Sequence, residues 1–142
     1  MKTTIKVFTL CFSLVLCVTG CSETNNSQYL PKSTSNLTVD SISTYPGATN
    51  GIGDGALLDG TLDVLSGCLV VTNNDSLIIP IFAAEDIKVS NGTLYLQNTP
   101  YSLGKKVKFG GGGLENTDYL SDNCKKLKEE KIEVSQFLVH NY

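Results

Sequence analysis

Short apolar runs, some of them alternating with polar residues, occupy the second half of the chain. The clearest are Cys68–Thr72, Leu77–Phe82 and Thr93–Gln97. Their length and their content of Val, Ile, Leu, Phe and Tyr are typical of β-strands. The sequence Asn-Asn-Asp-Ser at residues 73–76 separates the first two runs with turn-forming residues. These two runs therefore predict a β-hairpin.

Less regular runs predict further strands at residues 37–42, 56–65, 87–89, 102–109 and 132–139. Asn91-Gly92 favours a tight turn before the run that starts at Thr93. Pro80 has no backbone N–H to donate to a neighbouring strand. Its strand is therefore expected to lie at a sheet edge or to contain a bulge.

One short helix is predicted before the last strand. It is expected to run from a cap at Asn116 or Thr117 to about Leu127, with an acidic residue early and three lysines late, as the helix dipole favours. At helical spacing, Leu120, Cys124 and Leu127 would share one face.

These elements together predict a mainly β domain at residues 56–142. About six or seven short strands, with one helix before the closing strand, favour a small, partly open β-barrel. An OB-like barrel is the first topology that fits this order. Residues 21–55 are rich in Ser, Thr, Asn and Gly. They are expected to form the N-terminus of the mature chain and a disordered tether.

The first twenty residues have the composition of a secretory signal peptide. Lys2 and Lys6 give a positive start, and the apolar run Val7–Val18 follows. That run has about the length of a signal-peptide core and is too short for a bilayer span, which needs roughly 20 apolar residues. Residues 1–20 are therefore expected to be removed.

The sequence Val18-Thr19-Gly20-Cys21 resembles the lipobox of bacterial lipoproteins, where Leu or Val, a small residue, and Gly or Ala precede a cysteine. The resemblance implies that the Cys21 thiol receives a diacylglycerol, that the bond before it is cut, and that the new amine is acylated, for example by palmitate. Two or three chains would anchor the protein stably, because each buried methylene contributes about 0.8 kcal/mol. Ser22, in place of Asp, implies the outer membrane in cells that have one. An ordinary secretory signal with a chance cysteine is the alternative.

The charge of the mature chain bears on its partners. All 11 basic residues are lysines, and two of them lie in the leader, so nine lysines face fourteen acidic residues and the net charge is about −5. Nucleic-acid binding requires concentrated positive charge, so no nucleic-acid partner is expected. Contact with the membrane is expected through the lipid anchor at Cys21 alone.

Of the five cysteines, only two are expected to be available for pairing in the mature domain. Cys11 and Cys17 lie in the leader, and Cys21 would carry lipid. Cys68 and Cys124 remain, and a lone pair in an oxidising compartment most often forms a disulfide. Two free thiols are the alternative.

The order of several short motifs in the domain resembles small bacterial lipoproteins and secreted domains of unassigned function. The motifs are Gly60-Thr61-Leu62, Gly67-Cys68-Leu69, Ile79-Pro80-Ile81-Phe82, Leu103-Gly104-Lys105-Lys106-Val107 and Gly110–Gly113. The resemblance covers about residues 60–124. It implies a compact β-domain and carries no activity with it.

Neither catalytic residues nor a cofactor or metal are expected from the motifs. The run Gly110–Gly113 lacks the Lys and the Ser or Thr that follow the last glycine of a phosphate-binding loop. Two structural roles remain for it. In the first, Phe109 ends a strand and the glycines turn the chain. In the second, the glycines let two backbones pass closely.

The acidic pairs and the single histidine are also expected to be structural. His140 lies near the C-terminus, where a tail seldom holds a general base firmly. Asp59 and Asp63 would share a strand face, and Asp118 and Asp122 would lie one helical turn apart. Each pair offers too few oxygens for a calcium site, so solvated carboxylates are expected.

Two lysine groups and two tyrosines are candidates for a ligand surface. The first group is Lys105, Lys106 and Lys108, and the tyrosines are Tyr95 and Tyr101. The lysines either meet an acidic partner, such as a polyanionic cell-wall polymer, or protect an edge strand from pairing. The tyrosines either contact sugars or peptides or fill the core. The second group, at residues 125–128, is expected not far from the first if the disulfide forms.

The leading hypothesis for function is a non-enzymatic, membrane-tethered binding or structural module of the bacterial envelope, with an envelope protein or a cell-wall polymer as partner. The second is an inhibitor of a hydrolase such as lysozyme, by analogy with small disulfide-bearing β lipoproteins. Such inhibitors carry a Ser-Gly-x-x-Tyr-like loop, and the sequence Asn-Gly-Thr-Leu-Tyr at 91–95 is the nearest approach to it. An envelope enzyme is the third hypothesis.

Overall fold

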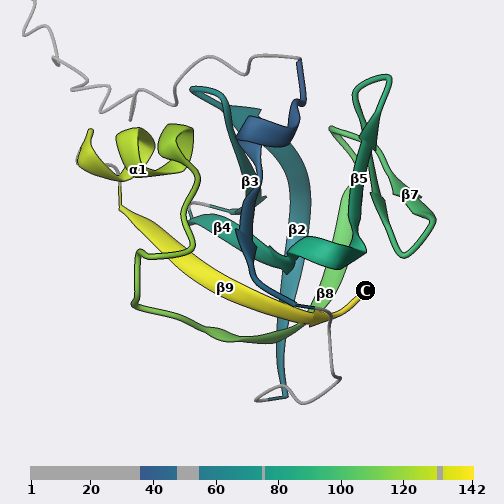
Figure 1. The fold of residues 1–142 in the computed structure, drawn as a ribbon. Coiled ribbons are helices and arrows are strands. Elements are labelled where there is room, and N and C mark those ends of the chain that lie inside the picture. The colour runs from purple at the N-terminus through teal and green to yellow at the C-terminus, as the bar shows by residue number, and fades with distance from the viewer. Residues whose placement is uncertain (1–35, 48–54, 75, 131–132) are drawn as a thin grey trace, which may run out of the picture.

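The computed structural model describes residues 36–47, 55–74, 76–130 and 133–142. The predicted leader, Cys21 and the first part of the predicted tether lie outside these residues. The described chain is mainly β with one short α-helix (Figure 1). The strands are β1 Ser43–Tyr45, β2 Ala56–Leu65, β3 Cys68–Asn73, β4 Ser76–Ala83, β5 Ile87–Ser90, β6 Thr93–Leu96, β7 Thr99–Tyr101, β8 Lys106–Gly113 and β9 Val134–Asn141, and the helix is α1 Asp122–Glu129.

Five of the strands form a closed barrel. β2, β3 and β4 are antiparallel neighbours, β8 pairs antiparallel with β2 and β9, and β9 pairs in parallel with β4. Counted among barrel strands alone, the order is first, second, third, fifth, fourth, which is the order of an OB-like Greek-key barrel. The predicted fold class is confirmed. The barrel is closed rather than partly open, because β4 and β9 pair over Leu77–Ile81.

One apolar core fills the barrel interior. Alternate residues of each strand point inward, as the two-residue period of a strand requires. They include Leu62 of β2, Leu69 and Val71 of β3, and Phe109 of β8, which are all fully buried. Phe82 of β4 packs edge-on against Phe109, with 5.4 Å between the ring centroids.

A second apolar core lies between the barrel wall and α1. The outward residues of β3 and β4, such as Val70, pack there against the helix. Cys124 and Leu127 share the buried face of α1, as predicted, and Leu120 is buried in the same core although it precedes the helix. The predicted disulfide between Cys68 and Cys124 is confirmed as well, and it crosses the same core.

The helix begins later than the sequence predicted. Its cap is Ser121, whose hydroxyl accepts a hydrogen bond from the Cys124 backbone N–H at 3.4 Å. Asn116, one of the two predicted caps, instead accepts a bond from the Asp118 N–H at 2.8 Å in a turn before the helix. Asp118 therefore does not lie one helical turn from Asp122 on α1, contrary to the expectation.

The N-terminal boundary of the folded unit also differs from the prediction. Leu37 and Ile42 are each only 4% exposed and belong to the barrel core. β1 pairs in parallel with β4, with Ser43 opposite Ile81. The strand expected at 37–42 is a 3-10 helix at 39–41 followed by β1. The polar composition of this segment did not indicate that it is folded, because only two apolar side chains dock it onto the barrel. The folded unit therefore starts well before the predicted boundary at Ala56.

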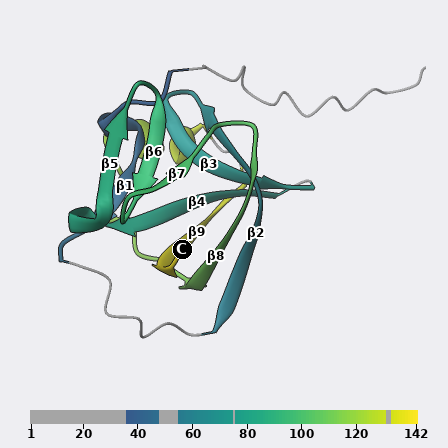
Figure 2. The same ribbon diagram turned by 90° about the vertical axis from the view of Figure 1, so that its right-hand side faces the viewer.

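A small antiparallel sheet of β5, β6 and β7 follows β4 and precedes β8 in the sequence, and it lies at one side of the barrel (Figure 2). Asn91 and Gly92 form its predicted tight turn, both with positive φ, at 50° and 72°. Leu94 and Leu96 of β6 are fully buried in the barrel core. The small sheet therefore closes part of the barrel interior off from solvent.

The glycine run continues β8 instead of ending it after Phe109. A β-carbon at Gly111 would overlap the Leu138 carbonyl oxygen and the Phe137 ring of β9. Close passage of two backbones, one of the two predicted roles, is thus confirmed at this position. The other role, a turn directly after Phe109, is wrong.

β4 is not an edge strand, contrary to the prediction from Pro80. It pairs with β3 as far as Ile78, with β1 from Ile81, and with β9 over most of its length. Pro80 falls between the first two pairings. No residue of β3 or β1 is in register opposite it, so its missing N–H is tolerated inside the sheet.

Candidate functional site

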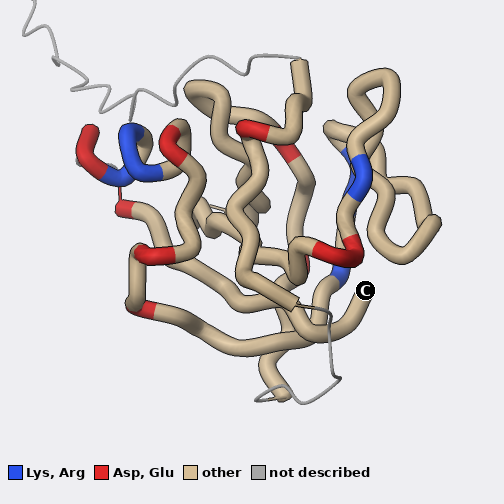
Figure 3. Tube along the Cα trace, in the orientation of Figure 1, with Lys and Arg blue, Asp and Glu red and all other residues tan. Residues whose placement is uncertain are grey.

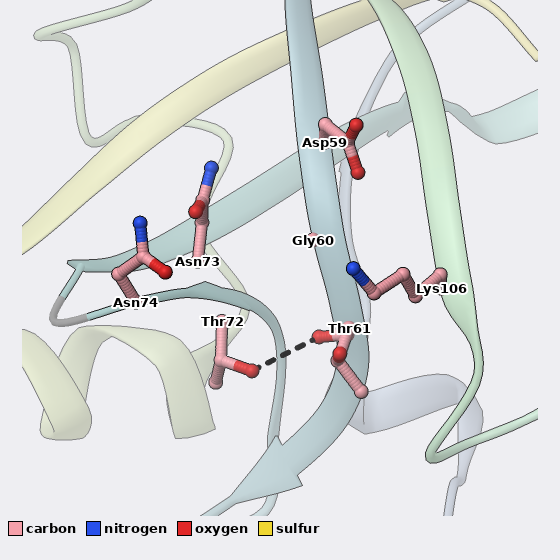
Figure 4. Close-up of a pocket in the computed structure, with 7 residues that line it drawn as sticks. All are labelled: Asp59, Gly60, Thr61, Thr72, Asn73, Asn74 and Lys106. Carbon is pink, nitrogen blue, oxygen red and sulfur yellow. Dashed lines mark hydrogen bonds between the residues drawn. The ribbon is translucent and has the colours of Figure 1, made fainter.

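A shallow polar hollow opens in the barrel wall where β3 leaves β2 (Figure 4). The two strands pair as far as Thr61 and Thr72. Beyond that pair, β2 continues along β8, whereas β3 enters its hairpin with β4 through Asn73 and Asn74. The strands diverge from this point and leave the hollow between them.

The hollow is small and almost entirely polar. Its volume is about 330 Å³, which is at the lower end of the range for small-molecule sites. The residues that line it are Asp59, Gly60, Thr61, Thr72, Asn73, Asn74 and Lys106. Three strands contribute to it, so its walls are held by the barrel itself.

Gly60 lies between the two walls of the hollow (Figure 4). A β-carbon at this position would come within 2.6 Å of Val71 Cγ1 and would also meet the Thr72 carbonyl oxygen. The Thr72 hydroxyl donates a hydrogen bond of 3.3 Å to the Thr61 carbonyl, which ties the strands at the point where they part. The lack of a side chain at Gly60 lets β3 pass close to β2.

The charged groups of the site lie on the side formed by β2 and β8. In the register of these strands Lys106 is opposite Thr61, and Lys108 is opposite Asp59. The Lys108 Nζ is 3.7 Å from Asp59 Oδ2, but the two side chains are 71% and 43% exposed, so this ion pair is weak. Among the residues that the structure describes, Lys106 makes no ion pair. Figure 4 shows its ammonium group extending from β8 toward β2, near Gly60.

The hollow presents both donors and acceptors. The amides of Asn73 and Asn74 and the hydroxyl of Thr61 can do both, whereas a carboxylate accepts and an ammonium group donates. The Thr72 hydroxyl donates to the Thr61 carbonyl, so it can only accept from a ligand. This combination is suited to reversible binding of a ligand with several hydroxyl groups.

The three lysines predicted for a ligand surface have different positions. Lys106 lines the hollow, and Lys108 pairs with Asp59 beside it. Lys105 precedes β8, and its carbonyl oxygen accepts a hydrogen bond from the Leu62 N–H at 3.0 Å. The alternative role, protection of an edge strand, stays open for the two lysines of β8, because β9 pairs only with Gly110–Gly113 and the part of β8 that carries the lysines pairs with β2 alone.

The second lysine group does not join the first. Lys125, Lys126 and Lys128 lie on or beside the exposed side of α1, across the molecule from the start of β8 (Figure 3). The disulfide fixes α1 to β3, yet the helix covers the part of the wall that faces away from β8. The expected proximity of the two groups is therefore wrong.

The two predicted tyrosines point to opposite faces of the small sheet. The Tyr101 ring packs against Phe109, with 5.4 Å between centroids, and burial raises the pKa of its hydroxyl. It thus fills the core, which is one of its two predicted roles. Tyr95 is half-buried, and Lys88 and Pro100 lie opposite it on the neighbouring strands.

The histidine and the remaining acidic candidates are held in the fold. His140 belongs to β9 rather than to a loose tail, and its ring lies 6.3 Å from that of Tyr45. Asp63 Oδ1 accepts a hydrogen bond of 2.7 Å from the Val64 N–H. In the described ranges, no three His, Cys, Asp or Glu side chains lie close enough together to hold a metal ion.

The part of the chain with assigned positions contains no helix long and apolar enough to cross a membrane. Comparison of the chain with models of known protein families, with curated proteins and with solved structures gives no match. The hollow must accordingly be interpreted from its own geometry.

One feature of the sequence does point to the hollow. Gly60 interrupts a run that otherwise predicts a strand, and an isolated glycine in a strand often marks close approach of another backbone. Asn73 and Asn74 were assigned to a turn only. Asn73 and Asn74 line the same hollow as Lys106 only because distant strands pair, and no local pattern contains that pairing.

Proposed function

We propose that the protein is a lipid-anchored, non-enzymatic binding module of the bacterial cell envelope. The observation that carries the proposal is the sequence Val18-Thr19-Gly20-Cys21 directly after an apolar leader. In this proposal Cys21 is the acylated N-terminus of the mature protein. Ser22 favours the outer membrane as its location.

The position of the folded unit supports this arrangement. Fifteen residues, 22–36, separate Cys21 from Leu37, which is the first of the described residues that is buried in the barrel. As a coil, a segment of that length would place its ends about 20 Å apart. The proposed tether is therefore shorter than the 21–55 segment that the sequence suggested, and it would keep the barrel close to the membrane surface.

The polar hollow supports a binding role for the barrel. Its hydrogen-bonding groups line a space of about 330 Å³, and all of them except Asn74, which lies in the turn after β3, belong to three strands of the barrel. Groups fixed on strands keep their geometry better than groups on loops. A polymer of the cell wall is the partner that we favour, with an envelope protein as the other possibility.

Anchoring is tested by fractionation of cells that express the full chain. The wild-type protein should stay with membranes through high-salt and alkaline washes, because acyl chains are not displaced by salt. The Cys21→Ser variant should appear in the soluble fraction. Cys17→Ser, which changes a leader cysteine outside the lipobox, is the matched control and should stay with membranes. Retention of the Cys21→Ser variant would contradict lipid anchoring.

Binding is tested separately by sedimentation with purified cell-wall polymer. Wild-type protein in detergent should sediment with the polymer and stay in the supernatant without it. Protein that remains in the supernatant in both cases, and that captures no envelope protein by crosslinking in cells, would contradict the binding role.

A further inference from the structure

We infer that the hollow between β2, β3 and β8 binds a saccharide unit that carries a negative charge. This inference rests on the proposed binding function and names the ligand class for it. Asn73 and Asn74 line the hollow on the side of β3, and Asp59, Thr61 and Lys106 line it on the side of β2 and β8 (Figure 4). Adjacent hydroxyl groups of a sugar both donate and accept, and this is the pattern that amides, a hydroxyl and a carboxylate together satisfy.

Lys106 is the residue that favours a negatively charged ligand over a neutral one. Its ammonium group is exposed, makes no ion pair with any residue in the described ranges, and extends from β8 toward β2 near Gly60. The nearby Asp59 carboxylate lies 3.7 Å from a different lysine, Lys108. A ligand carboxylate or phosphate can thus approach Lys106, and a charge-assisted hydrogen bond to it would be stronger than a neutral one.

The size and openness of the hollow suit one or two units of a longer chain. Its volume of about 330 Å³ is too small for a folded partner. The hollow lies on the outer barrel wall, where the strands diverge, so a polymer can continue beyond it in either direction. The strands that form the walls are held in register by hydrogen bonds, and the Thr72 hydroxyl donates a further hydrogen bond to the Thr61 carbonyl where β2 and β3 part. Binding therefore requires little ordering of the protein, which lowers its entropic cost.

The direct test is titration calorimetry of the full chain in detergent with two matched probes. One is a trisaccharide of galacturonic acid, and the other is the neutral galactose trisaccharide. We expect the charged probe to bind about tenfold more tightly than the neutral one, and we expect this advantage to shrink at high salt. Absence of binding by both probes, or equal affinity for them, would overturn the inference.

Three variants locate the binding in the hollow. Lys106→Gln keeps the length of the side chain and removes its charge, so it should remove the tenfold preference for the charged probe. Asn73→Ala should weaken the binding of both probes by the same factor. Lys126→Gln on α1 is the matched control, because it removes the same charge across the molecule, and it should bind as the wild type does. Thermal unfolding of each variant confirms that the barrel is intact. Wild-type affinities in Lys106→Gln and Asn73→Ala would show that the hollow is not the site.

The two proposals can fail independently. If the protein sediments with cell-wall polymer but binds neither trisaccharide, the saccharide site is wrong and the binding module stands. If the protein neither sediments with polymer nor captures an envelope protein, the binding module itself is wrong.

Discussion

Cys68 of β3 and Cys124 of α1 form a disulfide that fastens the only described α-helix to the outer wall of the barrel. The bond joins residues 56 positions apart in the sequence. Both cysteines are fully buried in the second core, between apolar residues of β3, β4 and the helix. The bond therefore links the middle of the chain to its C-terminal third and limits how far the unfolded chain can expand.

Removal of the disulfide should lower stability markedly. A closed loop of this length stabilises by roughly 4 kcal/mol in the chain-entropy model. We expect the Cys68→Ser, Cys124→Ser double variant to lose about 3–4 kcal/mol of unfolding free energy in urea titrations. A reductant should produce a similar loss in the wild type and no further loss in the double variant. A wild-type protein that is insensitive to reductant would argue against this contribution.

The glycine run offers two positions that differ only in their surroundings. Gly111→Ala would push a methyl group against the Leu138 carbonyl of β9, whereas a β-carbon at Gly113 meets nothing within 4 Å. We expect Gly111→Ala to cost about 1–3 kcal/mol or more, since overpacking forces the backbone to shift. Gly113→Ala should stay within about 0.5 kcal/mol of the wild type. Equal stabilities in urea would contradict the close packing of β8 on β9.

The segment before β2 provides a similar comparison. Leu37 is 4% exposed in the barrel core, whereas Val39, two residues later, is 61% exposed. Leu37→Ala should lower the free energy of unfolding by about 2–4 kcal/mol, and Val39→Ala should change it by less than about 0.5 kcal/mol. Thermal or urea unfolding measures both. If Leu37→Ala were as stable as Val39→Ala, residues 37–45 would not be part of the folded unit.

Local pattern was enough to predict the strands of the barrel and the buried face of the helix. The hairpin of β3 and β4 follows from two apolar runs around Asn73 and Asn74, and the pairing of Cys68 with Cys124 follows from elimination. Long-range pairing was not predictable in the same way. Pro80 suggested an edge, yet parallel pairing of β4 with β9 places it inside the sheet.

The segment at 37–45 and the hollow were missed for the same reason. Leu37 and Ile42 are isolated apolar residues in a polar stretch, and only the fold shows that both reach the core. Gly60 and Lys106 come from strands distant in sequence, and their proximity depends on the register of β2 with β8. Composition and local pattern contain no information on these contacts.

Tyr101 should make stability depend on pH in the alkaline range. Burial raises the pKa of its hydroxyl above the ordinary value of about 10. Below that pH, both the folded and the unfolded chain keep the proton, and Tyr101 adds no pH dependence. As the pH rises through it, the unfolded chain releases the proton first, so the folded state loses stability.

Urea midpoints between about pH 9 and pH 11 measure this effect. The midpoint of the wild type should fall with rising pH, and the fall should be shallower in the Tyr101→Phe variant, which has no proton to release. Identical slopes in the two proteins would show that Tyr101 is not held in its protonated form by the core.

The central claim is that Cys21 is the lipid-bearing first residue of the mature protein. Mass spectrometry of the N-terminal peptide, from protein purified from bacterial membranes, tests it most directly. We expect a peptide that begins at Cys21 and carries the mass of a diacylglyceryl group, with or without a third acyl chain on its amine. An N-terminus at another residue, or a Cys21 with no added mass, would contradict the proposed anchor.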